Sequence, residues 1–156
     1  MKIFLLTHQK ELHRKTNTGA LAVDLFGEMV EVVVWERTAP NKKLLEAIEQ
    51  GRVALLYPCD EGETLCSRTS YDTYVLIDST WQEAQKIYNR SPYLHTIPCV
   101  NIEIAKQSVY TLRRNQKVYG LCTAEIVVEV LNSQSMFELA EDLEQSLDTF
   151  VGDGKI

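Results

Sequence analysis

The chain has 156 residues, of which 45% are hydrophobic and 24% charged, and its formal net charge is −6 at pH 7. This length predicts a single domain over residues 1–156, and the composition excludes a disordered chain. No apolar run is long enough to span a membrane, and the short apolar N-terminus lacks the small-residue cleavage site of a signal peptide. We therefore expect a cytoplasmic protein with no membrane partner.

The four cysteines, Cys59, Cys66, Cys99 and Cys122, are scattered and form no CxxC pair. A zinc site is therefore not expected, and no metal-binding residues are assigned. Because the chain carries no export signal, we expect four reduced and mostly buried thiols.

The acidic excess is confined to the C-terminal part of the chain. Residues 1–128 contain fifteen acidic and fifteen basic residues, whereas residues 129–156 contain seven acidic residues and one Lys. Residues 79–124 contain six basic and two acidic residues, a net charge of +4. Such a segment is compatible with a phosphate-backbone partner, although an ordinary solvated surface explains the charge equally well.

Strand and helix patterns alternate along the chain. Their predicted order is strand 2–7, helix 19–26, strand 29–35, helix 42–50, strand 53–57, strand 73–77, helix 79–89, strand 99–104, helix 123–131 and an acidic helix 135–150. Residues 59–70 and 107–121 are polar or basic and predict loops. The alternation predicts an α/β fold with a mostly parallel sheet and flanking helices.

The most informative motif lies where the strand 73–77 ends, at Asp78-Ser79-Thr80-Trp81. In open α/β sheets, ligands bind just outside the carboxyl ends of the strands. Thr80 or Ser79 can cap the helix that follows, and Trp81 offers a large stacking surface. Asp78, Thr80 and Trp81 are therefore the candidate catalytic residues.

Three further segments have residue types suited to ligands, and each also has a simpler structural explanation. The polar residues 11–19 can hold an anion at a helix start or only cap that helix. The strand end at 56–58 can wall a ring pocket or belong to the core. The basic, tyrosine-bearing residues 108–114 suit phosphate and base contacts or form an ordinary surface loop.

In this order, the four segments resemble the DTW-domain family over about residues 3–131. The matching strings are Glu11…Arg14…Thr16-Asn17-Thr18-Gly19, Leu56-Tyr57-Pro58, Asp78-x-Thr80-Trp81, and Ser108-x-Tyr110-x-Leu112-Arg113-Arg114 with Thr123-x-Glu125. Cys122 and Ala124 depart from the pattern, which more often has a small hydroxyl residue and a larger apolar residue there. We also expect a short form, without the zinc-binding N-terminal cysteines of longer relatives.

The resemblance implies a tRNA-uridine aminocarboxypropyltransferase. Such an enzyme takes S-adenosylmethionine as co-substrate, transfers its 3-amino-3-carboxypropyl group to N3 of a uridine in tRNA, and releases methylthioadenosine. The resemblance also implies a SPOUT-like fold with a C-terminal trefoil knot. Pattern analysis alone does not predict a knot, because knots are rare.

Under this resemblance, Asp78 accepts the N3 proton, Thr80 fixes the turn, and Trp81 stacks on a base or packs beneath the turn. The cofactor-binding candidates are Leu56, Tyr57, Pro58, Ile77, Asp78, Tyr110, Leu112, Thr123 and Glu125. Glu125 would bind the amino group of the cofactor or serve only as a charge at a helix start. The tRNA-binding candidates are Arg14, Lys15, Asn17, Lys86, Arg90, Arg113 and Arg114.

Three other functions remain open at this point. An S-adenosylmethionine-dependent RNA methyltransferase would release a different by-product, and a non-catalytic RNA-binding module would need only the basic segment. A hydrolase using Asp78 is disfavoured, because the three histidines lie in other segments. The motifs specify neither the tRNA, nor the uridine, nor the oligomeric state.

Overall fold

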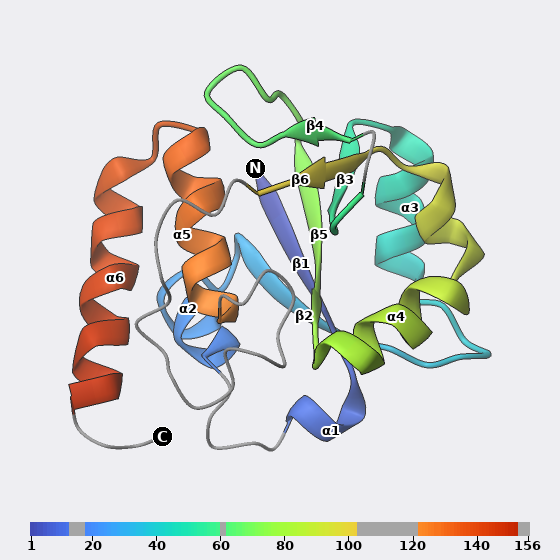
Figure 1. Cartoon of the computed structure of the whole chain (residues 1–156), viewed down its shortest axis with the longest axis horizontal. Helices are drawn as coiled ribbons and strands as arrows, with labels where there is room; N and C mark the ends of the chain where they lie inside the picture. The colour runs from blue at the N-terminus through green and yellow to red at the C-terminus, as the bar shows by residue number, and fades with distance from the viewer. Residues whose placement is uncertain (13–17, 60–61, 103–121, 153–156) are drawn as a thin grey trace.

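The computed structural model describes residues 1–12, 18–59, 62–102 and 122–152, which build a layered α/β fold (Figure 1). In these ranges six strands form one sheet, and every hydrogen-bonded pair is parallel. The strands are β1 (Lys2–Thr7), β2 (Val30–Val34), β3 (Val53–Leu56), β4 (Glu63–Thr64), β5 (Thr73–Asp78) and β6 (Cys99–Asn101), in the spatial order β2-β1-β5-β3-β6-β4. The predicted α/β class is thereby confirmed.

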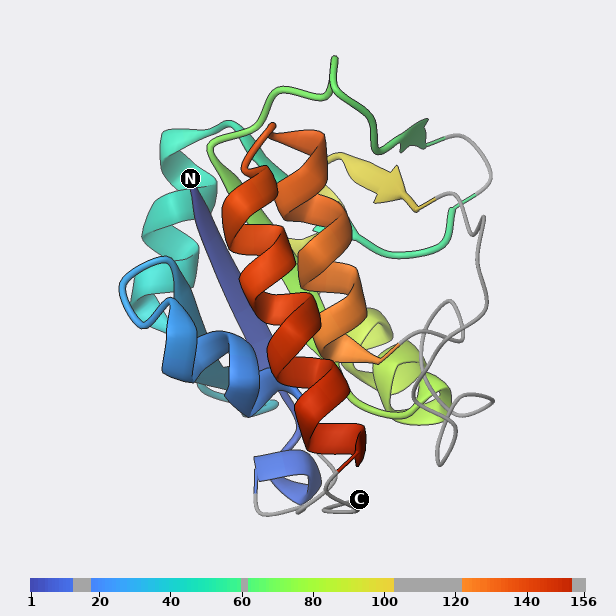
Figure 2. The ribbon, with the colours of Figure 1, turned by 90° about the vertical axis from the view of Figure 1, so that its left-hand side faces the viewer.

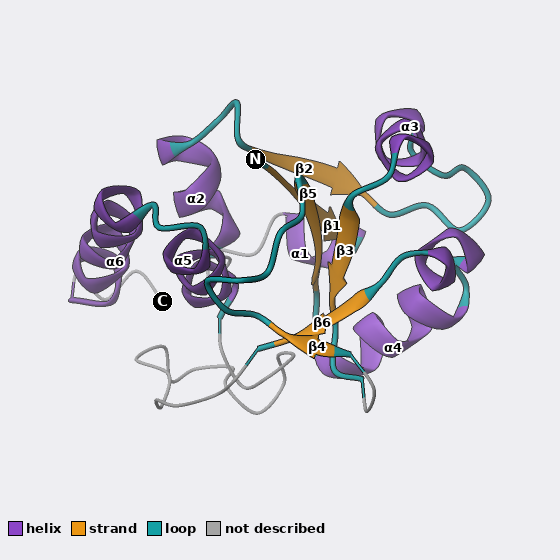
Figure 3. Ribbon diagram, turned by 90° about the horizontal axis from the view of Figure 1, so that it is seen from above, coloured by secondary structure: helices purple, strands orange, loops and turns teal. Residues whose placement is uncertain are grey.

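Helices cover both faces of this sheet (Figure 3). One face carries α2 (Gly19–Leu25), α5 (Thr123–Ser133) and α6 (Phe137–Gly152), and the other carries α3 (Lys42–Gln50) and α4 (Trp81–Asn89). The short helix α1 (Gln9–Leu12) follows β1, and a 3-10 turn, η1 (Pro92–Thr96), follows α4.

The middle residues of the central strands β1 and β5 are apolar on both faces of the sheet, as expected for strands that helices cover on both sides. Side chains alternate between the faces. Ile3 and Leu5 of β1 therefore join the core beneath α2 and α5, whereas Phe4 and Leu6 join the core beneath α3 and α4.

The register of β1 against β5 aligns the ends of the two central strands. Leu5 pairs with Leu76 and Thr7 pairs with Asp78. The last residues of both strands therefore lie side by side at the carboxyl edge of the sheet.

The acidic C-terminal helix lies beside α5 on the outside of the fold (Figure 2). Ala140, Leu143 and Leu147 recur at helical spacing and are buried in the core beneath α2 and α5. Its acidic residues face outward, since Glu138, Glu141, Asp142, Glu144 and Asp148 are all exposed. Among the described helices, none has the length and apolar character needed to cross a membrane.

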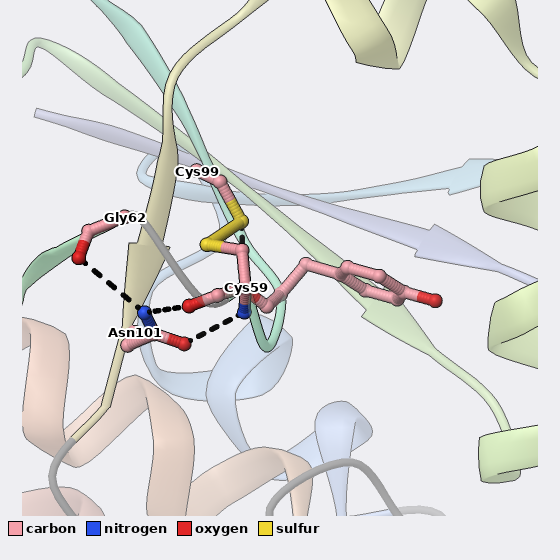
Figure 4. The surroundings of a disulfide bond; sticks show 5 residues. Cys59, Gly62, Cys99 and Asn101 are labelled. Atoms are coloured by element: carbon pink, nitrogen blue, oxygen red, sulfur yellow. Dashed lines mark hydrogen bonds between the residues drawn. A yellow bond between two sulfur atoms is a disulfide. The ribbon is translucent and has the colours of Figure 1, made fainter.

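Two of the four cysteines form a disulfide, Cys59–Cys99, with their Cα atoms 6.5 Å apart (Figure 4). The expectation of four reduced thiols is therefore wrong for this pair. The register of β3 against β6 explains the difference, because Leu55 pairs with Cys99 and the chain beyond β3 turns back over β6. Cys66 is a free exposed thiol, and Cys122 is free and buried.

The Asn101 side chain supports the loop that carries this disulfide (Figure 4). Its Oδ1 accepts a hydrogen bond from the Cys59 N–H at 2.9 Å, and its Nδ2 donates to the Cys59 carbonyl at 2.6 Å. One amide side chain thus satisfies both backbone polar groups of Cys59.

Some predicted boundaries differ from the structure. The predicted loop 59–70 contains β4, and the short helix α1 lies where no element was expected. The predicted loop 107–121 lies outside the described residues. The expected trefoil knot depends on the path of residues 103–121 and stays a prediction.

Candidate functional site at the carboxyl edge of the sheet

The Asp78–Trp81 turn leaves the sheet at the end of β5 and enters α4. Thr80 is the N-cap residue: its Oγ1 accepts a hydrogen bond from the Glu83 N–H at 3.3 Å and donates one to Glu83 Oε1 at 2.8 Å. The Thr80 N–H in turn donates to Glu83 Oε1 at 3.2 Å, which completes a capping box. Of the two residues predicted to cap this helix, Thr80 and Ser79, Thr80 is the N-cap.

Glu83 also faces His8, which follows β1, with 3.4 Å between His8 Nδ1 and Glu83 Oε2. Burial of the Glu83 carboxyl raises its pKa, whereas the hydrogen bonds from Thr80 and the nearby His8 lower it. Together the lowering effects outweigh the effect of burial, so the pKa of Glu83 lies below its usual value. Glu83 therefore holds the turn as a carboxylate at neutral pH.

Asp78 is 2% exposed and lies on the face of the sheet that α2 and α5 cover. Its Oδ1 accepts a hydrogen bond of 2.6 Å from the Thr123 hydroxyl, at the start of α5. Nearby in the same layer, Thr18 Oγ1 accepts a hydrogen bond of 3.1 Å from the Ala124 N–H. Side chains from three distant motifs are thereby joined around one buried carboxylate.

The bond from Thr123 gives a direct prediction about stability. Thr123→Val keeps the shape of the side chain but removes the donor to a buried carboxylate, so we expect the free energy of unfolding in urea to fall by about 1.5–3 kcal/mol. Thr123→Ser keeps the hydroxyl and is the matched control. Equal stability of the two variants would contradict the assigned hydrogen bond.

Trp81 lies on the opposite face of the sheet from the Asp78 carboxylate. Its ring stacks on Tyr57 with 5.7 Å between centroids, and Tyr57 stacks on Tyr88 at 4.5 Å. The His95 ring packs on the last ring of this row, Tyr88, with 4.4 Å between their centroids. Of the two roles considered for Trp81, packing beneath the turn corresponds to its contacts here.

The cofactor-binding candidates divide between the two faces of the sheet. The side chain of Leu56 lies in the core beneath α2 and α5, whereas those of Tyr57 and Ile77 lie in the core beneath α3 and α4. Pro58 is half-buried beyond the end of β3. Tyr110 and Leu112 lie outside the described residues.

The start of α5 brings Thr123 and Glu125 to the same face as Asp78. Glu125 is buried, and its Oε1 accepts a hydrogen bond from the Cys122 N–H at 3.0 Å. Glu125 therefore caps the helix, one of its two predicted roles. Burial, together with the nearby charge of Glu125, raises the pKa of Cys122 to about 12, so this thiol stays neutral.

Among the tRNA-binding candidates, Lys86 and Arg90 are exposed on or at the end of α4 and lie one helical turn apart. The other candidates, Arg14, Lys15, Asn17, Arg113 and Arg114, lie outside the described residues.

Sequence analysis did not single out Thr7 or a cavity beside Asp78. The cavity has a volume of about 150 Å³, and Leu5, Thr7, Gly19, Val23, Val32 and Asp78 are among the residues that line it. Thr7 could have been found as the last residue of the first apolar strand. The cavity could not, because its walls come from two helices, α1 and α2, and three separate strands.

A sheet whose described strands all pair in parallel, with a buried carboxylate at the carboxyl ends of its central strands, defines an α/β protein of the kind that binds ligands at that edge. The chain belongs to the DTW domain family, whose model matches residues 1–153. The predicted family is thereby confirmed.

The chain is also similar to tRNA-uridine aminocarboxypropyltransferase 2 of Drosophila melanogaster. The two are 30% identical over 154 residues, which cover 94% of this chain and 60% of that protein. This chain therefore spans less than two thirds of its relative. No solved structure matches it.

Proposed function

We propose that this protein transfers the 3-amino-3-carboxypropyl group of S-adenosylmethionine to N3 of a uridine in tRNA and releases methylthioadenosine. Membership of the DTW family and the name of the fly relative support a tRNA-modifying transferase. The single observation that carries the proposal is the buried Asp78 carboxylate, which Thr123 holds at the wall of a cavity.

The reaction requires one new bond, one broken bond and an acceptor for one proton. S-adenosylmethionine supplies an electrophilic carbon on its sulfonium, so the new N3–C bond forms as the C–S bond breaks and its electron pair leaves with the thioether. The uridine N3 carries a proton and is a weak nucleophile until that proton is removed. Asp78 accepts this proton as the general base.

The donor set on this face fits a cationic co-substrate with one apolar end. The Glu125 carboxylate is buried on the face that α2 and α5 cover, and Leu56 belongs to the same core cluster as Cys122. Leu56, Pro58, Thr123 and Glu125 would hold the co-substrate. Tyr110 and Leu112 would complete this wall, as the family resemblance implies.

Thr80 keeps the turn rigid through its capping box, and Trp81 holds the turn from below through its stack on Tyr57. Both would act as positioning residues for Asp78. Rigid placement matters here because the enzyme must align N3 with only one of the carbons on sulfur.

The tRNA would reach this edge across basic side chains. Lys86 and Arg90 would contact phosphates from α4. Further contacts would come from the segments 11–19 and 108–114, through Arg14, Lys15, Asn17, Arg113 and Arg114. The same resemblance supports a SPOUT-like trefoil knot. We further propose that the enzyme acts on tRNA in the cytoplasm.

The by-product of the reaction tests this proposal. We expect purified protein, S-adenosylmethionine and unmodified bulk tRNA to yield methylthioadenosine, and none when tRNA is omitted. S-adenosylhomocysteine would instead identify a methyltransferase. Binding of tRNA without any binding of S-adenosylmethionine would identify a non-catalytic RNA-binding module.

A further inference from the structure

The cavity beside Asp78 has the size and the lining of a pocket for one base. It lies between the helices α1 and α2 and the strands β1, β2 and β5, on the face that carries the Asp78 carboxylate. Its volume of about 150 Å³ is below the roughly 300 Å³ at which pockets for drug-sized ligands begin. A whole S-adenosylmethionine is therefore too large for it, whereas a single pyrimidine ring is not.

We propose that this cavity is the acceptor pocket, which receives the uracil ring of the target nucleotide. This inference rests on the proposed function and adds the place where the uridine binds. Enzymes that act on a stacked base extrude it into a pocket of this kind. The uracil N3–H would then point at the Asp78 carboxylate.

The lining selects a neutral ring with an N–H donor. Leu5, Val23 and Val32 supply apolar walls for the two faces of the ring. A second carboxylate, Asp24, also lines the cavity. The two carboxylates repel a phosphate group, so the described lining favours an uncharged ring.

Asp78 also distinguishes uracil from cytosine. The N3 of uracil donates a hydrogen bond, which a carboxylate accepts. The N3 of cytosine presents a lone pair, so the same carboxylate repels it. A site that accepts a hydrogen bond from one edge of a substrate discriminates against an analogue that presents an acceptor at the same place.

Strand β2 offers a matched pair of variants. Val32 and Val34 are 39% and 37% exposed, and they project from the same face of the strand because they are two residues apart. Val32 lines the cavity, whereas Val34 is not among its lining residues. Val32→Phe therefore fills the pocket, and Val34→Phe makes the same chemical change beside it.

We expect Val32→Phe to lower kcat/KM for tRNA by about tenfold or more, with unchanged affinity for S-adenosylmethionine by calorimetry. We expect Val34→Phe to stay within about twofold of the unaltered protein in both measurements. Equal activity of the two variants would overturn the inference. Loss of S-adenosylmethionine binding in Val32→Phe would also overturn it, because the cavity would then belong to the co-substrate.

Crosslinking keeps the test independent of turnover. Under ultraviolet light, we expect tRNA transcribed with 5-bromouridine to crosslink to peptides that contain Val23 or Val32. Crosslinks confined to other peptides would overturn the inference. If the unaltered protein released no methylthioadenosine yet gave the expected crosslinks, the proposed reaction would fail while the base pocket would stand.

Discussion

Asp78→Asn is expected to lower methylthioadenosine release by about 10²- to 10⁴-fold, the range that general-base catalysis contributes. The amide has nearly the shape of the carboxylate, and its oxygen can still accept the hydrogen bond from Thr123. It cannot take up the uridine proton. The affinity for S-adenosylmethionine, measured by calorimetry, should change little.

A second aspartate provides the control for this substitution. Asp72 is exposed before the start of β5, where its Oδ2 pairs with Arg52 Nε at 3.0 Å. Asp72→Asn removes the same charge at the opposite edge of the sheet and should leave methylthioadenosine release unchanged. Full activity of Asp78→Asn would remove Asp78 from the mechanism and leave the family assignment intact.

Reduction of the Cys59–Cys99 disulfide is expected to lower the free energy of unfolding by about 2–4 kcal/mol. The bond joins residues 40 positions apart and so restricts the unfolded chain. Urea unfolding with and without dithiothreitol measures this effect. The variant carrying both Cys59→Ser and Cys99→Ser should be insensitive to the reductant.

Thiol counting checks the same pairing. Without reductant, the native protein should show one reactive thiol, Cys66, and the denatured protein two, because unfolding also exposes Cys122. Cys66→Ser is the matched control and should leave the response of stability to dithiothreitol unchanged. Four reactive thiols in the denatured, unreduced protein would contradict the disulfide.

The strong periodic signals of the sequence were sufficient to predict the sheet. Short, mainly apolar runs such as residues 2–7 and 73–77 are typical of strands covered on both faces, and their alternation with helices predicts parallel pairing. β4 was missed because Glu63 and Thr64 have no apolar period and join the sheet only through pairing with β6. Cys59 and Cys99 were not paired because their proximity follows from the register of β3 and β6.

The candidate site was predicted as a set of motifs and not as a geometry. The family resemblance included both Asp78 and Thr123, but the bond between them exists because α5 returns to the carboxyl edge of the sheet. The same limit explains why Leu56, Tyr57 and Ile77 were assigned to one cofactor site. Neighbours along a strand face opposite sides, so a contiguous motif is divided between two cores.

The order of the strands has a consequence for folding. β1 pairs with β5, so Lys2 meets Thr73, and the hydrogen bonds around Asp78 join residues 45 and 106 positions apart. Such long-range pairing slows folding, because long loops must close before their contacts form. During synthesis, the backbone edge of β1 that pairs with β5 therefore has no partner strand until β5 has been made. The polar cluster at the sheet edge forms later still, when the last third of the chain arrives.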